Sequence, residues 1–119
     1  MAKTLAEHQA EAKELLGEEL KHPRVGAVLG LSEEVGELVK EIMELEIYST
    51  PQFPLDEQVR TALGDEAADV LFSLVEVCSA YGIDLETAYE TKLAKIRGKR
   101  EEWIARYSPG LRLRREKLD

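Results

Sequence analysis

The stretch VGAVLGLSEEVGELVKEIMELE, residues 25–46, decides the fold because its apolar side chains recur at steps of three and four residues. That spacing places them along one side of an α-helix and predicts an amphipathic helix that packs against a core. The alternation of apolar and polar residues that would indicate a β-strand is found neither here nor elsewhere in the chain. The apolar positions that define this side are Val28, Leu31, Val35, Leu38, Ile42 and Leu45.

Outward from this stretch, proline and glycine divide the chain into three further helical segments. Residues 57–81 repeat the same apolar spacing, with Asp56 placed to cap the start of the helix and Gly82 to end it. Residues 4–20 are rich in Ala, Glu and Leu, so their helix is expected from intrinsic propensity. A fourth helix is expected over residues 85–107. Its apolar residues, which are predicted to point inward, are Leu85, Tyr89, Leu93, Ile96 and Trp103.

These segments predict an all-α, four-helix bundle-type domain over residues 1–107. The intervening YSTPQFPL, residues 48–55, contains two prolines and is expected to form a loop, since proline cannot continue a helix. Residues 108–119 are expected to form a short, loosely held basic tail. A chain of 119 residues, 44% of them apolar and 34% charged, has room for one domain.

The composition excludes several classes of protein. A net charge of −8 argues against nucleic acid as a partner, because affinity for nucleic acid comes from Lys and Arg neutralising phosphates. The longest apolar run, residues 25–31, is far too short to span a membrane. The single cysteine provides neither a disulfide framework nor a Cys-based zinc site. With no secretory signal expected at the start of the chain, the predicted location is cytoplasmic.

Acidic and basic residues are segregated along the chain. Residues 92–119 contain 10 of the 16 basic residues and 4 acids, a net charge of +6, whereas residues 1–91 have a net charge of −14. A phosphate ligand bridged by a metal ion needs both kinds of group, because the acids bind the cation and the bases bind the phosphate oxygens. The alternative is that these charges form solvated helix surfaces and a basic tail.

Two rows of acidic residues border the apolar sides of the second and third helices. Each member of a row stands one residue before an apolar position, so both rows lie at the edge of the core. The row of the second helix consists of Glu34, Glu37, Glu41 and Glu44. That of the third consists of Glu66, Asp69 and Glu76, with the polar but uncharged Ser73 at the remaining position. Lys92, Lys95 and Lys99 form a similar cationic row on the fourth helix.

The acidic rows allow two interpretations. Carboxylates that lose water without gaining a partner are costly, and a shared divalent cation would satisfy them. Because the candidate ligands are all oxygens, the metal would be Mg²⁺ or Mn²⁺. Alternatively, the same acids form salt bridges between helices with Lys92, Lys95 and Arg97 and bind no metal.

The sequence resembles the MazG-like, all-α nucleoside triphosphate pyrophosphohydrolase superfamily over about residues 20–100. The segments that carry the resemblance are LSEEVGELVKEI at residues 31–42 and GDEAADVLFSLVEVCSAYGIDLETAYETKL at residues 64–93. The signature of the superfamily is Glu-x-x-Glu, a spacer and Glu-x-x-Asp. It is matched by Glu34-Val35-Gly36-Glu37 and Glu66-Ala67-Ala68-Asp69, followed by a Gly-Ile-Asp turn and Lys92.

The resemblance implies a Mg²⁺-dependent enzyme that cleaves a nucleoside triphosphate between the α and β phosphates, releasing a monophosphate and pyrophosphate, in housekeeping of the nucleotide pool. It further implies assembly as a homodimer or a dimer of dimers. Glu34, Glu37, Glu66 and Asp69 would be the metal ligands by this likeness. Lys92 and Lys95 would contact the phosphates.

Two further residues are candidates for the site. Glu33 could position the attacking water, although it also fits a plain surface acid. His22, ahead of the second helix, could contact the nucleotide base. Two other functions stay open: a phosphoribosyl-ATP pyrophosphohydrolase of histidine biosynthesis, and a non-catalytic helical interaction module whose acids are salt-bridged. The apolar surface that includes Phe72 and Trp103 independently predicts at least a dimer.

Overall fold

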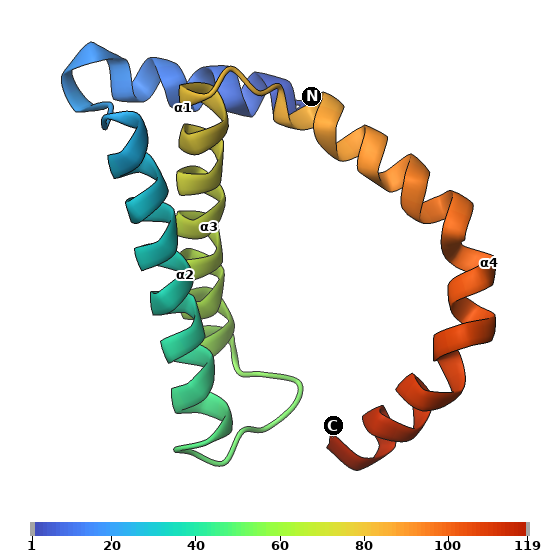
Figure 1. Cartoon of the computed structure of the whole chain (residues 1–119). Helices are drawn as coiled ribbons and strands as arrows, with labels where there is room; N and C mark the ends of the chain where they lie inside the picture. Colours follow the sequence, from blue (N-terminus) through green and yellow to red (C-terminus); the bar gives the residue numbers. More distant parts are fainter. Residues whose placement is uncertain (1, 119) are drawn as a thin grey trace. The chain divides into compact units, whose positions relative to one another are not determined.

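A computed structural model describes residues 2–118, and every regular element in that range is an α-helix (Figure 1). This confirms the predicted all-α class and the number of helices. Two compact units divide the chain, one ending at Leu85 and the other beginning at Glu86, and each is described by itself. The helices are α1 (Leu5–Leu20), α2 (Arg24–Glu46), α3 (Glu57–Ala80) and α4 (Leu85–Leu118).

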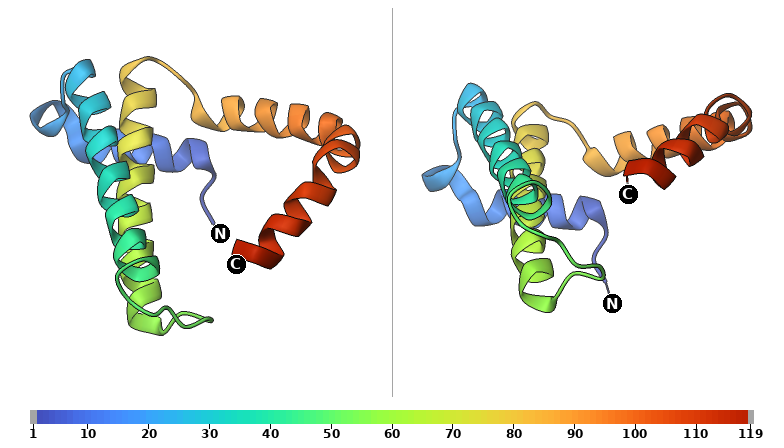
Figure 2. Two further views of the ribbon diagram at one scale, coloured as in Figure 1. Left: turned by 60° about the horizontal axis from the view of Figure 1, so that its bottom comes forward. Right: turned by 90° about the horizontal axis from the view of Figure 1, so that it is seen from below.

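An antiparallel pair formed by α2 and α3 is the centre of the first unit (Figures 1 and 2). Small side chains let the helices of this unit approach closely, and the buried core consists of Ala12, Ala27, Val75 and Cys78. Larger residues of the predicted apolar side, such as Val35 and Ile42, each remain 42% exposed. The helix pair therefore covers only part of the apolar surface that was predicted to lie in a core.

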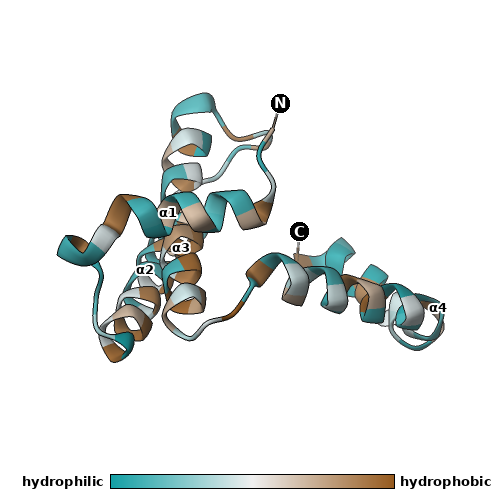
Figure 3. Ribbon diagram, turned by 90° about the horizontal axis from the view of Figure 1, so that it is seen from above, coloured by the Kyte–Doolittle hydropathy of each residue, from teal (hydrophilic) through white to brown (hydrophobic). Residues whose placement is uncertain are grey.

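Across one end of the pair, where α2 begins and α3 ends, runs α1 (Figure 1). Thr4 caps α1 by accepting a hydrogen bond from the backbone N–H of Glu7, whose carboxylate accepts one from the backbone of Thr4 in return. The helix is interrupted at Gly17, which adopts φ +57°. Figure 3 shows apolar turns of α3 next to α1, which agrees with the burial of Ala12 on α1.

The ends of α3 form as the sequence predicts. The side chain of Asp56 accepts a hydrogen bond of 3.0 Å from the backbone N–H of Val59, which satisfies one of the free donors at the start of the helix. At the other end Gly82 adopts φ +69°, a conformation that glycine tolerates and other residues resist. The backbone N–H of Ile83 then donates to the carbonyl of Cys78 and closes the turn.

Two predictions about the fourth helix are wrong. It does not end near residue 107 but continues through Pro109 to Leu118, because residues 111–118 are rich in Leu, Arg, Glu and Lys, which favour helix. Pro109 removes one backbone hydrogen bond, and α4 is bent along its length (Figure 2). No described residue of α4 is buried, so the residues predicted to point inward are not core residues in the single chain. The boundary between a domain of residues 1–107 and a tail of residues 108–119 stays a prediction.

Among the described residues, no helix combines the length and the apolar character needed to cross a membrane.

Replacing Gly82 with Ala should destabilise the protein, because alanine in the left-handed conformation costs about 1–2 kcal/mol. Gly64→Ala is the matched control, since Gly64 lies inside α3 and an added Cβ would have no neighbour within 4 Å. That control should stabilise the helix by about 0.5–1 kcal/mol. Denaturant unfolding of the two variants measures both effects. A Gly82→Ala protein as stable as the parent would contradict the assigned turn.

Candidate metal site on the α2–α3 pair

Three carboxylates from the two paired helices converge. Glu34 and Glu37 lie one turn apart on α2, and Glu66 lies on α3. One carboxylate oxygen from each residue lies within 4.8 Å of those of the other two. The helix i, i+3 spacing and the antiparallel register together create this convergence, since α2 supplies two members of the cluster and α3 supplies the third.

Two of the converging carboxylates, Glu34 and Glu66, are partly buried, whereas Glu37 is exposed. Oε2 of Glu34 and Oε2 of Glu66 are buried and accept no hydrogen bond. Within the unit that ends at Leu85, no basic side chain forms an ion pair with either residue or with Glu37. Buried oxygens without partners are costly, so this arrangement favours a ligand that supplies positive charge.

Electrostatics point in the same direction. Loss of solvent raises the pKa of Glu34, and the neighbouring charges of Asp69 and Glu37 raise it further. Loss of solvent is also the largest effect that raises the pKa of Glu66, followed by the charges of Glu37 and Asp69. Glu34 and Glu66 therefore resist ionisation without a cation, and a bound divalent ion would reverse that effect.

Asp69 and Glu33 occupy the margin of this group. Asp69, predicted as the fourth ligand, lies outside the three-residue cluster, yet its charge acts on both Glu34 and Glu66. Glu33 is exposed on α2 and its charge also raises the pKa of Glu34. The structure thus brings three of the four predicted ligands together and leaves Asp69 at their edge.

Lys92 and Lys95 are exposed on α4, seven and ten residues after Leu85. They belong to the second unit, which begins at Glu86. Their side chains are about one turn apart on the same helix, so both can face one ligand.

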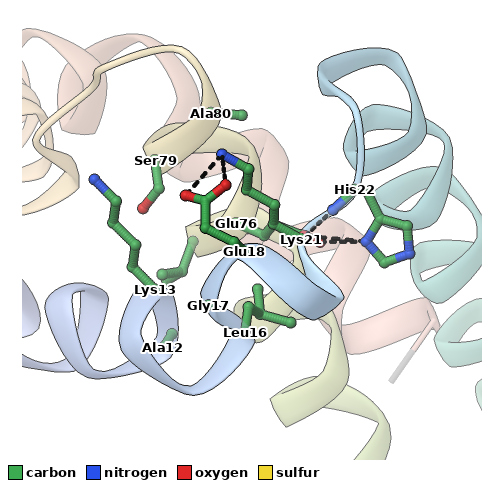
Figure 4. A pocket seen from close by; sticks show the side chains of 11 residues that line it. Ala12, Lys13, Leu16, Gly17, Glu18, Lys21, His22, Glu76, Ser79 and Ala80 are labelled. Atoms are coloured by element: carbon green, nitrogen blue, oxygen red, sulfur yellow. Dashed lines mark hydrogen bonds and ion pairs between the residues drawn. The ribbon is translucent and has the colours of Figure 1, made fainter.

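His22 lines a cavity of about 350 Å³ at the end of the pair where α2 begins and α3 ends (Figure 4). Its Nδ1 lies 3.0 Å from Oε2 of Glu76, and its backbone N–H donates to the same oxygen over 3.2 Å. The Glu76 side chain is only 12% exposed. Ala12 and Val75 contribute apolar surface to the cavity, and Lys13, Lys21 and Ser79 contribute polar groups.

Glu76 was expected in an acidic row, but its pairing with His22 was not predicted. The antiparallel register could have predicted this pairing. If Glu66 faces Glu34, then Glu76, ten residues further along α3, must lie near a residue about ten positions before Glu34. An antiparallel pair therefore sets the end of α3 beside the chain that enters α2, and Glu76 meets His22 there.

The geometry defines a class of site, in which oxygen ligands from two antiparallel helices can hold a hard divalent cation. Residues 26–104 match the family model described as the MazG nucleotide pyrophosphohydrolase domain, and the chain belongs to this family. The match confirms the resemblance seen in the sequence. It includes the three clustered carboxylates, Asp69, Lys92 and Lys95, whereas His22 precedes it. No curated protein and no solved structure gives a significant match to the chain.

The raised pKa values of Glu34 and Glu66 predict how pH changes stability without metal. When a carboxyl pKa is higher in the folded than in the unfolded state, the group favours folding at low pH, and that contribution is lost as pH rises through the folded pKa. As the pH rises from 4.5, the ordinary pKa of a glutamate, towards neutral, the melting temperature of the metal-free protein should therefore fall more steeply than that of Glu34→Gln.

Thermal melts of both proteins across this range, with and without Mn²⁺, provide the measurement. Mn²⁺ should raise the melting temperature of the parent most at neutral pH, because protons compete for the same oxygens at low pH. Identical pH dependence in the two metal-free proteins would contradict this account of Glu34.

Proposed function

We propose that this protein is a nucleoside triphosphate pyrophosphohydrolase. It cleaves a ribo- or deoxyribonucleoside triphosphate between the α and β phosphates and releases the monophosphate and pyrophosphate. The observation that carries the proposal is the convergence of Glu34, Glu37 and Glu66, with two orphaned buried oxygens, inside the region that matches a nucleotide pyrophosphohydrolase domain.

The donor set fits Mg²⁺, with Mn²⁺ as a substitute. All ligand atoms in the cluster are carboxylate oxygens, and neither Cys nor His contributes to it. Glu34, Glu37 and Glu66 would hold the ion, with Asp69 completing the ligand set. When bound, the ion neutralises charge on the phosphates and lowers the pKa of a coordinated water.

The remaining roles fall to groups around the cluster. Hydrolysis forms a bond between a water oxygen and the α-phosphorus and breaks the bond from that phosphorus to the bridging oxygen, so pyrophosphate leaves with the bonding electrons. Glu33 orients the water and accepts its proton. Lys92 and Lys95 hold the phosphate oxygens that gain charge as pyrophosphate departs.

His22 is the proposed contact for the nucleotide base. Glu76, its partner, lies ten residues beyond Glu66 on α3, which corresponds to about 15 Å along the helix axis. An extended nucleoside triphosphate can bridge such a separation. The cavity beside His22 combines apolar surface with polar side chains, as base-binding pockets do.

We also propose that the protein assembles as a homodimer or a dimer of dimers and acts in the cytoplasm on the nucleotide pool. Phe72 and Leu71 on α3 are 41% and 50% exposed, and Trp103 on α4 is 40% exposed. So many exposed large apolar side chains favour burial against a second copy.

A panel of canonical and modified triphosphates with Mg²⁺ tests the proposed reaction. Release of pyrophosphate with one equivalent of monophosphate is the expected result. Release of orthophosphate would contradict it, and so would turnover of phosphoribosyl-ATP alone. Absence of turnover together with absence of Mn²⁺ binding by calorimetry would instead identify a non-catalytic helical module.

The carboxylate cluster predicts the behaviour of four amide variants. Glu34→Gln, Glu37→Gln, Glu66→Gln and Asp69→Asn should each abolish turnover and weaken Mn²⁺ binding. Each should also melt at a higher temperature than the metal-free parent, because removing one charge relieves repulsion among the others. Glu44→Gln, in the same acidic row but outside the cluster, is the control and should retain activity. Near-parental activity in two of the four variants would refute the metal site.

The cationic row predicts a different pattern. Lys92→Met keeps the aliphatic stem and removes the charge, so turnover should fall by about 10- to 1,000-fold while Mn²⁺ affinity stays the same or rises. Lys99→Met, about one turn beyond Lys95, is the comparison and should lose less activity. Equal losses at Lys92, Lys95 and Lys99 would mean that the lysines act only as a diffuse positive field.

A further inference from the structure

Two contacts fix the register of the α2–α3 pair at two levels along its length (Figure 1). Glu66 meets Glu34 at the carboxylate cluster, and Glu76 meets His22 at the end where α2 begins. The helices keep one antiparallel register between these levels, and all of this part belongs to the unit that ends at Leu85. A ligand that reaches from the cluster to His22 must cross the part of the pair that lies between them.

Gly30 and Ser73 lie in this intervening part. Gly30 is seven residues before Glu37 on α2, and Ser73 is seven residues after Glu66 on α3. Seven residues make nearly two helical turns, so each position faces almost the same way as its cluster residue, about 10 Å further along the axis. Because the helices are antiparallel, both displacements run towards the end where His22 lies.

Gly30 leaves open space on this side of the pair. It is partly buried, yet a Cβ atom at this position would have no neighbour within 4 Å. Its backbone is helical, so it does not need the left-handed conformation that requires glycine at Gly82. Glycine inside a helix is less stable than alanine. The folded chain therefore gives no reason for glycine here, whereas a ligand that occupies the space would.

Ser73 supplies a hydroxyl group that the chain does not use. Its Oγ forms no hydrogen bond within the described residues, whereas Oγ of Ser49 and Oγ of Ser79 each have a partner. Serine inside a helix commonly donates to the carbonyl four residues earlier, and Ser73 does not. The residue is partly buried, and serine favours helix less than alanine does. Its hydroxyl is therefore free to bond a ligand.

The order of these features along the pair matches the order of groups in a nucleotide. The sugar is bonded to the base on one side and, through its 5′ carbon and oxygen, to the α-phosphate on the other. With phosphates at the cluster and the base at His22, the sugar lies between Gly30 and Ser73.

We propose that Gly30 and Ser73 are specificity-determining residues for the sugar of the substrate. Gly30 leaves room for the sugar ring, and the hydroxyl of Ser73 forms a hydrogen bond with a hydroxyl group of that sugar. The inference rests on the proposed function, because it takes the positions of the phosphates and the base from it.

Ser73→Ala tests the hydrogen bond. The substrates are the ribonucleoside triphosphate that the parent turns over fastest and its 2′-deoxy and 3′-deoxy forms. Removing the bonded hydroxyl should lower kcat/KM of the parent by about 10-fold, and Ser73→Ala should lose about as much on the full substrate. On the form that lacks this hydroxyl, Ser73→Ala should equal the parent, which identifies the hydroxyl as 2′ or 3′. Ser32→Ala, exposed on α2, is the control and should keep parental activity.

Equal losses of Ser73→Ala on all three substrates would overturn the hydrogen bond, and so would parental activity on all three.

Gly30→Ala and Gly30→Leu test the open space. Neither side chain meets a neighbour at its Cβ, so both metal-free variants should melt at or above the temperature of the parent. The value of kcat/KM should nevertheless fall by about 10-fold in the Ala variant and further in the Leu variant, because the added atoms displace the sugar. Mn²⁺ affinity should stay within about twofold of the parent, since the cluster keeps its oxygens.

Gly64→Ala and Gly64→Leu are the matched controls, because Gly64 has equally open space but is exposed, two residues before Glu66. Both should keep parental activity. Parental kcat/KM in Gly30→Leu would overturn the inference, as would an equal loss in Gly64→Leu. If Gly30→Leu does not fold, Gly30→Ala decides the question by the same comparison.

Binding without turnover separates this inference from the proposed function. In an α,β-methylene triphosphate a carbon replaces the oxygen that bridges the α and β phosphates, so calorimetry with Mn²⁺ measures affinity alone. Ser73→Ala should bind this analogue about 10-fold more weakly than the parent, and Gly30→Leu more weakly still. If the parent neither binds nor cleaves any triphosphate, the proposed function fails and the inference falls with it. If the parent does both and the variants bind as it does, only the inference is overturned.

Discussion

The close antiparallel contact between α2 and α3 is the constraint on which the rest of the structure depends. Ala27, 1% exposed, and the buried Val75 and Cys78 allow the helices of the unit to approach, and that approach fixes one register. The same register sets Glu66 opposite the acids of α2 and sets Glu76 beside His22. A candidate metal site and a candidate base pocket therefore follow from one packing arrangement, at two positions along it.

This arrangement keeps like charges together at some cost to the folded state. The carboxylates of Glu34 and Glu66 have lost solvent and gained neighbouring acids, and neither has a hydrogen-bond partner for its buried oxygen. Selection for stability alone would replace them with apolar or amide side chains. Their presence in this chain, which belongs to the MazG nucleotide pyrophosphohydrolase family, is explained if the folded state is completed by a cation and its phosphate ligand.

Much of the fold could be predicted from local sequence, and the exceptions have physical causes. The helix predicted from the apolar spacing of residues 25–46, the Asp56 cap and the Gly82 turn depend on neighbours within a few residues, and all three are found in the structure. The clustering of Glu34, Glu37 and Glu66 followed from two helices meeting side by side. The exposure of α4 could not be predicted, since periodicity shows which residues are apolar but not whether the same chain covers them. The hydrogen bonds of Gln9 to the backbone of Ile83 and Leu85 could not be predicted either, because they join distant segments through one polar side chain and do not depend on any sequence periodicity.

Two hydrogen-bonded side chains of the first unit lie at the end of the helix pair where α2 begins and α3 ends. Gln9 accepts a hydrogen bond from the backbone N–H of Leu85, and Glu76 accepts one from the backbone N–H of His22. At the opposite end, residues 47–56 connect α2 to α3, and Ile47, Tyr48 and Phe53 there are largely exposed. Side-chain hydrogen bonds hold one end of the pair together, whereas a loop joins the helices at the other end, and loops tolerate changes in length. Residues lost or gained in this connector would leave the facing acids in place, which makes it a natural insertion point for an epitope tag or a fluorescent reporter.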